Sequence, residues 1–126
     1  MELNDISGAI IAAALKVHSE IGPGVLESVY QTCVHHELRK LGFEIQAEVA
    51  LPVLYQGLRL ESGFRIDLLV ANRVIVEIHK AQLLTYLRLA NKPLGLLLNF
   101  NVVHMREGIR RVLNNRYRPA QAAGHV

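Results

Sequence analysis

The chain of 126 residues has one cysteine, no tryptophan and no hydrophobic run long enough to span a bilayer. A single cysteine, Cys33, excludes an internal disulfide framework and fits a reducing compartment. The absence of tryptophan and of interleaved aromatics argues against a base-stacking platform for single-stranded nucleic acid. The longest apolar runs, at residues 9–15 and 94–98, are far too short for a membrane span, and the N-terminus is acidic rather than basic. These features predict a cytoplasmic protein that does not enter a membrane.

The composition is that of a globular protein, with 51% hydrophobic and 20% charged residues. The length suits one domain, which we expect over residues 1–115, followed by a frayed tail at 116–126. A net charge of +3 permits a nucleic-acid partner without requiring one. No cofactor motif is present, so nothing in the chain favours a small-molecule enzyme.

Hydrophobic periodicity and turn signals divide the chain into alternating helices and strands. Helices are expected at about residues 4–21, 26–40, 81–89 and 106–113, and strands at about 43–53, 58–60, 66–70, 74–78 and 94–100. The strands at 66–70 and 74–78 are separated by only three residues, which predicts an antiparallel hairpin. The order of elements predicts an α/β fold, a mixed central sheet flanked by helices.

Each strand of this hairpin carries one acid, Asp67 in the first and Glu77 in the second. Adjacent strands bring such carboxylates close together, which is unfavourable unless a cation or a catalytic task compensates it. The next helix carries Gln82 and Tyr86, one turn apart and therefore on one face. The pattern indicates a metal-dependent hydrolase.

Residues 24–30, GVLESVY, match the G-x-x-E-x-x-Y signature, and the chain resembles the GxxExxY proteins of the PD-(D/E)XK nuclease superfamily. The resemblance runs from about residue 4 to 114. Further similar stretches are residues 21–24, 38–39, 51–53, 67–70, 81–87 and 95–101. It implies an αβββαβ core, which agrees with the order of elements above.

The resemblance also implies roles for individual residues. Asp67 and Glu77 would bind Mg²⁺ or Mn²⁺, with Glu27 as an accessory acid from the rim of the site. Gln82 and Tyr86 would form the Q-x-x-x-Y element that some DNA-processing members carry. The implied reaction is metal-dependent hydrolysis of DNA, or less readily RNA, and paired subunits that cut both strands make a homodimer plausible.

The chain departs from the superfamily pattern directly after Glu77. The E-x-K motif requires a lysine two residues on, where this chain has His79; Lys80 is one residue late, and the connector before Gln82 is shortened. On a continuing strand Lys80 would point away from Glu77, whereas a helix starting at His79 would let it turn back. His79 is then a candidate base, or a metal ligand favouring Mn²⁺ or a later transition metal.

Each candidate also has a structural interpretation. Asp67 and Glu77 alone would be solvent-facing residues of alternating strands, and Glu27 alone would complement a helix dipole. Tyr30 is expected to be a core residue with its hydroxyl at the surface. Two functions therefore stay open: a nuclease with an altered site, and an inactive nuclease fold that serves as a binding or assembly module.

Basic residues gather near the C-terminal end of the sequence. Arg106, Arg110 and Arg111 are expected on the last helix, where Arg106 and Arg110 could follow a phosphate backbone. The competing interpretation is a solvated helix end, where cations suit the dipole.

Overall fold

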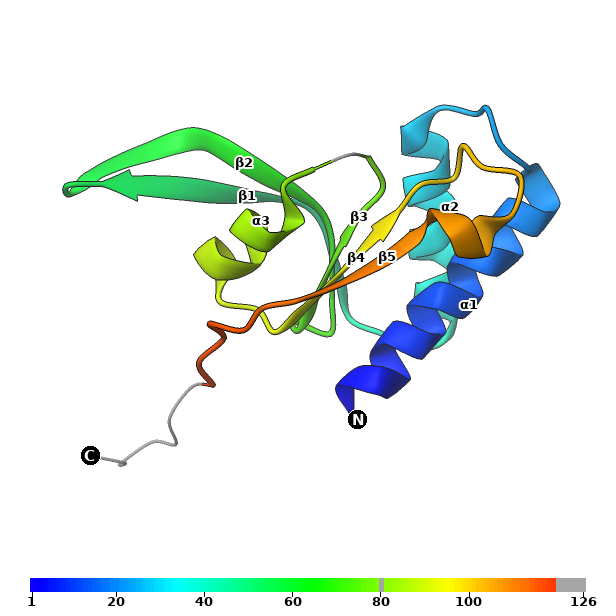
Figure 1. Cartoon of the computed structure of the whole chain (residues 1–126), viewed down its shortest axis with the longest axis horizontal. Coiled ribbons are helices and arrows are strands. Elements are labelled where there is room, and N and C mark those ends of the chain that lie inside the picture. Colours follow the sequence, from blue (N-terminus) through cyan, green and yellow to red (C-terminus); the bar gives the residue numbers. More distant parts are fainter. Residues whose placement is uncertain (80, 120–126) are drawn as a thin grey trace.

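A computed structural model describes residues 1–79 and 81–119 of the chain, and in it one sheet separates two layers of helices (Figure 1). The elements in chain order are α1 (Leu3–Ile21), α2 (Glu27–Lys40), β1 (Ile45–Tyr55), β2 (Leu58–Val70), β3 (Val74–Glu77), α3 (Leu83–Ala90), β4 (Leu94–Leu98), the 3-10 helix η1 (Met105–Gly108) and β5 (Ile109–Leu113). The sheet order is β1-β2-β3-β4-β5. Only β3 and β4 run parallel, and α3 connects them. The predicted α/β class and the αβββαβ core are confirmed.

The two faces of the sheet carry separate hydrophobic clusters. On the first, the buried stripe of α1 and α2 covers alternate residues of β2, β3 and β4, including Leu68, Val76 and Leu96. On the second, which we call the α3 face, α3 packs its apolar side on Leu69 and Ile75. Because side chains alternate along a strand, each of these strands contributes residues to both clusters. This explains why the strand sequences are almost continuously apolar.

The prediction of a last helix at 106–113 is wrong. Residues 105–108 form one short 3-10 turn, and residues 109–113 form β5, which pairs antiparallel with β4. Without β5, the buried strand β4 would expose a row of backbone N–H and C=O groups at its open edge. Satisfying that edge outweighs the modest helix preference of the arginines. Arg110 and Arg111 therefore lie on opposite faces of a strand rather than on one helix.

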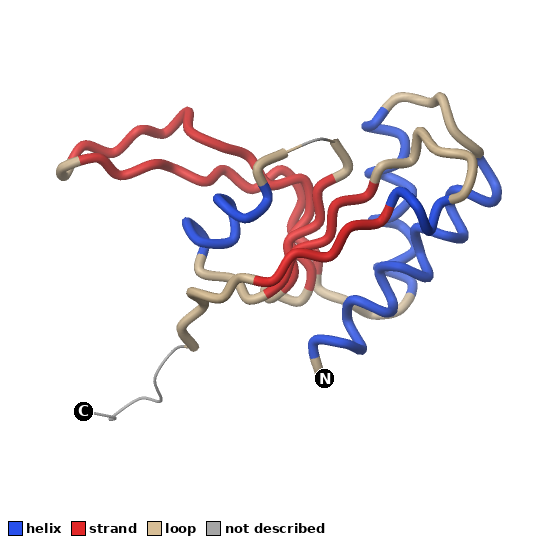
Figure 2. The backbone as a smooth tube through the Cα atoms, viewed as in Figure 1, coloured by secondary structure: helices blue, strands red, loops and turns tan. Residues whose placement is uncertain are grey.

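The β1–β2 hairpin continues well beyond the rest of the sheet as a two-stranded ribbon (Figure 2). Its register shifts between Leu51 and Val53, at Pro52, where proline cannot donate to the ladder. Beyond that point Leu54, Tyr55 and Leu58 are all largely exposed. The ribbon is thus an apolar projection with no covering layer within the described chain.

The C-terminal segment follows β5 back across the end of α3. Arg118 exchanges two hydrogen bonds with Asn91, accepting at 2.8 Å and donating at 3.1 Å. Residues 120–126 of the expected tail lie outside the described part of the chain. No helix of the described part is long and apolar enough to cross a membrane.

One glycine, at the end of η1, permits a close approach to the residue that follows β4. A Cβ at Gly108 would lie 2.0 Å from the carbonyl oxygen of Asn99, whose own N–H donates to Gly108. We expect Gly108→Ala to lower the free energy of unfolding by about 1–3 kcal/mol, because the backbone of a packed turn must shift. Urea denaturation measures this change.

The matched control is Gly8→Ala in α1, where an added Cβ meets nothing within 4 Å. This second substitution should stabilise the protein by roughly 0.5–1 kcal/mol, because alanine loses less backbone entropy in a helix. Equal effects of the two substitutions would contradict the assigned close approach at Gly108.

Candidate metal centre

The register of the β2–β3 hairpin brings the two predicted acids together. Leu68 pairs with Val76, so Asp67 and Glu77 face each other at the next position, where the ladder ends. The backbone N–H of Asp67 donates to Glu77 Oε1 over 3.4 Å. Glu77 also pairs with Leu97 of β4, a residue of the α3-face cluster. Both acids therefore lie where β3 ends, beside α3.

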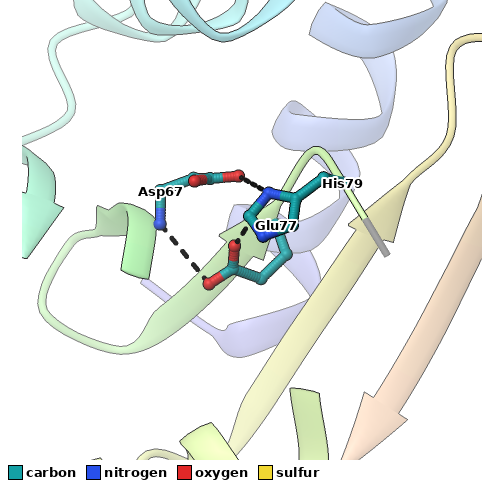
Figure 3. Close-up of side chains that lie close together, drawn as sticks. All are labelled: Asp67, Glu77 and His79. Atoms are coloured by element: carbon teal, nitrogen blue, oxygen red, sulfur yellow. Dashed lines mark hydrogen bonds and ion pairs between the residues drawn. The ribbon is translucent and has the colours of Figure 1, made fainter. Parts of the chain in front are cut away.

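His79 completes a three-residue group with these acids (Figure 3). Its Nδ1 lies 3.0 Å from Asp67 Oδ2 and 3.9 Å from Glu77 Oε2. The N–H of Ile78 donates to the same Asp67 oxygen over 2.8 Å, which fixes the turn that follows β3. One ligand atom of each side chain lies within 4.8 Å of the others. Two carboxylates and an imidazole are a donor set that binds Mn²⁺ or a later divalent metal well, and Mg²⁺ through the oxygens.

Glu77 is the least compensated group of the site. It is completely buried, and Oε2 has no hydrogen-bond partner within the described residues. Burial first, and the Asp67 carboxylate second, raise the pKa of Glu77 from 4.5 to about 9. Without a cation the carboxyl group therefore keeps its proton at neutral pH. A buried acid with an unsatisfied oxygen beside a second acid fits a bound divalent metal.

Glu27 lies apart from this group, at the rim of a neighbouring cavity. It is exposed at the start of α2 and, with His79 and Asn99, lines a cavity of about 460 Å³. The structure thus brings Glu27 to the cavity beside His79 but does not place it among the three clustered ligands.

Tyr30 determines where Glu27 is held. Its hydroxyl donates to the carbonyl of Gly22 over 2.5 Å and accepts from the N–H of Val25 over 3.1 Å. The ring is buried and stacks on Phe100 at 4.3 Å. The expected core position of Tyr30 is confirmed, and its hydroxyl is hydrogen-bonded to the loop at residues 22–25. Tyr30 ties down the loop that leads into Glu27.

Tyr86 and Gln82 have different surroundings. Tyr86 is buried against Phe64 on the α3 face. Burial, and then the Glu77 and Asp67 carboxylates, raise the pKa of Tyr86, so its hydroxyl lies within their field. Gln82 precedes the first residue of α3, is exposed, and lines a second cavity with Arg110. Gln82 is thus outside the acid cluster, on its flank.

The connector between β3 and α3 consists of residues 78–82. Because α3 begins at Leu83, a helix starting at His79 is excluded. Lys80, the other candidate base, lies outside the described residues. Asn99 and Asn101, which sequence reasoning missed, line the cavity over His79. Their position in the sequence could have identified them, because they follow the end of β4, the strand parallel to the one that carries Glu77.

These features define a class: an α/β protein whose hairpin acids and neighbouring histidine form a candidate metal centre beside a cavity. The family model of the PD-(D/E)XK nuclease superfamily matches residues 4–112, and the chain belongs to this superfamily. No curated protein and no solved structure gives a significant match. The superfamily implies a nucleic-acid substrate and a divalent metal.

The protonated state of Glu77 predicts a pH dependence of stability. In EDTA, the folded protein retains a proton that the unfolded chain releases near pH 4.5, so the free energy of unfolding should fall as pH rises from 4.5 toward 9. One such group contributes a slope of up to about 1.4 kcal/mol per pH unit. Urea denaturation across this range measures the slope.

Glu77→Gln removes the titrating proton while keeping the shape of the side chain, so its slope should be smaller and its stability at pH 8 higher than in the wild type. Glu107→Gln changes an exposed glutamate outside the site and should leave the slope unchanged. Identical slopes for Glu77→Gln and the wild type would show that Glu77 is already ionised.

Proposed function

We propose that this protein is a metal-dependent nuclease of the GxxExxY type that hydrolyses phosphodiester bonds of DNA. The observation that carries the proposal is the buried pair of Asp67 and Glu77, with one carboxylate oxygen unsatisfied and His79 alongside. Such a pair adds nothing to hydrophobic packing, and burying a carboxyl group costs free energy. A role in binding a cation explains both.

Asp67 and Glu77 would hold Mg²⁺ or Mn²⁺, which supplies an activated water and neutralises charge on the scissile phosphate when bound. Glu27 would act from the rim, through a water or through substrate. Asp67 accepts the Nδ1 proton of His79 and so orients the ring, leaving Nε2 to take a proton from the attacking water. His79 then does the work of the motif lysine as a base.

Three further residues belong to the proposal with smaller roles. Tyr86 would hydrogen-bond a metal-bound water or the substrate, because its hydroxyl lies in the field of both acids. Gln82 would contact the substrate on the flank of the site. Lys80 is a candidate on sequence grounds alone. The single-domain organisation and the cytoplasmic location expected from composition are part of the same proposal.

A cleavage assay tests the proposal. Purified protein should cut plasmid or single-stranded DNA with Mg²⁺ or Mn²⁺ and not with EDTA, and Glu77→Ala should abolish cutting because a metal ligand is lost. His79→Ala should reduce the rate by about 10²–10⁴-fold, the usual contribution of a general base. Glu107→Ala is the control and should retain wild-type activity, because Glu107 is exposed and is not one of the three clustered residues.

His79→Lys and Lys80→Ala separate the two candidate bases. If His79 replaces the motif lysine as the base, His79→Lys should keep activity but move its pH range upward, because lysine loses its proton at a higher pH than histidine. Lys80→Ala should then change little. If cutting depends on Lys80 instead, Lys80→Ala will remove it. If His79 is a metal ligand, changing it should weaken cutting with Mn²⁺ more than cutting with Mg²⁺, because Mg²⁺ is held by the oxygens alone.

The alternative is an inactive nuclease fold that binds DNA or assembles with a partner. It is favoured by one observation, the histidine where the superfamily motif has lysine. DNA binding with no cutting, at concentrations where His79→Lys cuts, would establish this alternative. Binding should then be insensitive to EDTA.

The proposal includes a homodimer, so that two sites can reach both strands. The apolar run at residues 9–15 does not supply the contact, because Ile10, Ala13 and Ala14 are buried in the core. The exposed apolar face is instead the end of the β1–β2 ribbon, where Leu54 is 69% exposed and Leu58 58%. A second copy of the ribbon would cover it.

Sedimentation equilibrium tests the dimer. The wild type should associate at micromolar concentrations, and Leu58→Lys should shift it to monomer by placing a charge in the buried contact. Val103→Lys is the matched control, since Val103 is a lone exposed apolar side chain in a loop. A wild-type monomer at all concentrations would contradict the homodimer and leave the nuclease proposal standing.

A further inference from the structure

A row of three side chains crosses the sheet at the metal centre. Glu77 of β3 pairs with Leu97 of β4 in parallel register, and Leu97 pairs with Arg110 of β5 in antiparallel register. Paired residues on neighbouring strands point to the same face. With strands about 4.8 Å apart, the backbone of Arg110 lies roughly 10 Å from that of Glu77.

The cavities confirm which face Arg110 occupies. Arg110 lines a cavity of about 360 Å³ together with Leu97, Gln82 and Thr85, all on or beside the α3 face. Leu97 also lines the cavity of about 460 Å³ that contains His79. The two cavities thus share Leu97 as a lining residue, and His79 lines one of them and Arg110 the other.

Arg111, the next residue, points the other way. Its guanidinium donates to Asn4 Oδ1 of α1 over 2.9 Å. Strand alternation therefore gives two adjacent arginines opposite surroundings. One is hydrogen-bonded behind the sheet, and the other opens toward the cavity beside the site.

Arg110 also lacks a competing acid. No carboxylate of the described residues lies within ion-pair distance of its guanidinium, whereas Arg59 and Arg65 of the ribbon are both paired with glutamates. An exposed guanidinium has a rigid fork of donors that matches the oxygens of a phosphate. Its surroundings, neutral side chains of Gln82 and Thr85, leave this charge available to a ligand.

We propose that Arg110 binds a non-scissile phosphate of the DNA strand whose reacting phosphate lies at Asp67 and Glu77. This inference rests on the proposed nuclease function and adds a specific contact to it. The strand would run across β3, β4 and β5 on the α3 face, passing over Leu97. Arg110 would thereby set the position of the reacting phosphate without taking part in the chemistry.

The test measures DNA binding in EDTA, where cutting does not interfere. Fluorescence anisotropy with a short labelled DNA duplex gives the dissociation constant of wild type, Arg110→Ala and Arg111→Ala at several salt concentrations. Arg110→Ala should weaken binding by about tenfold or more and reduce the salt slope by about one, as loss of one phosphate contact does. Arg111→Ala removes the same charge one residue away and should stay within about twofold of wild type.

Thermal unfolding of both variants checks that each is folded, and Arg110→Lys provides a variant that keeps the charge. Arg110→Lys should recover part of the affinity and all of the salt slope. Equal losses for Arg110→Ala and Arg111→Ala would overturn the assigned contact while leaving the nuclease proposal intact. A wild type that binds no DNA in EDTA and cuts none with Mg²⁺ or Mn²⁺ would overturn both.

Discussion

The interaction on which this structure depends is the contact between two carboxyl groups at the end of the β2–β3 ladder. Asp67 is well compensated, since one oxygen accepts from the Ile78 N–H and faces His79. Glu77 has a single long hydrogen bond and one oxygen with no partner among the described residues. Burial of such a group is stable only with a proton or a cation. A slip of β3 by one residue against β2 would turn Glu77 to the face opposite Asp67, so the hairpin and the site are specified together.

The helices on either side serve this centre in different ways. On one side, Gly22 and Gly24 adopt positive φ of 78° and 89°, which glycine tolerates. The Tyr30 hydroxyl binds the carbonyl of Gly22 and the N–H of Val25 in the same loop. The spacing of the G-x-x-E-x-x-Y signature then has a physical basis: tyrosine closes the loop and the glutamate stands at the cavity rim. On the other side, α3 seals the sheet with apolar residues and brings Tyr86 into the field of the acids.

Local signals in the sequence were enough to predict the hairpin, the order of elements as far as β4, and the meeting of Asp67 with Glu77, because alternation and a three-residue turn determine the register. They failed at residues 109–113, where the edge of β4 demanded a strand and separated Arg110 from Arg111. Pairing across three strands is not visible in a local pattern, so the row from Glu77 to Arg110 could not be foreseen. The position of the His79 ring relative to the acids could not be predicted either, since it depends on where β3 ends and α3 begins.

His79 gives the site a different charge balance from the one that a lysine at this position would give. A lysine beside Asp67 and Glu77 would carry a fixed positive charge and favour ionised carboxylates even without metal. Nδ1 of His79 lies 3.0 Å from Asp67 Oδ2, whereas burial raises the pKa of Glu77 to about 9, so that Glu77 retains a proton. Metal binding must then displace that proton, which couples metal affinity to pH. A site of this kind holds its cation more weakly in acid than one with the motif lysine, and its acids depend more fully on the metal for their compensation.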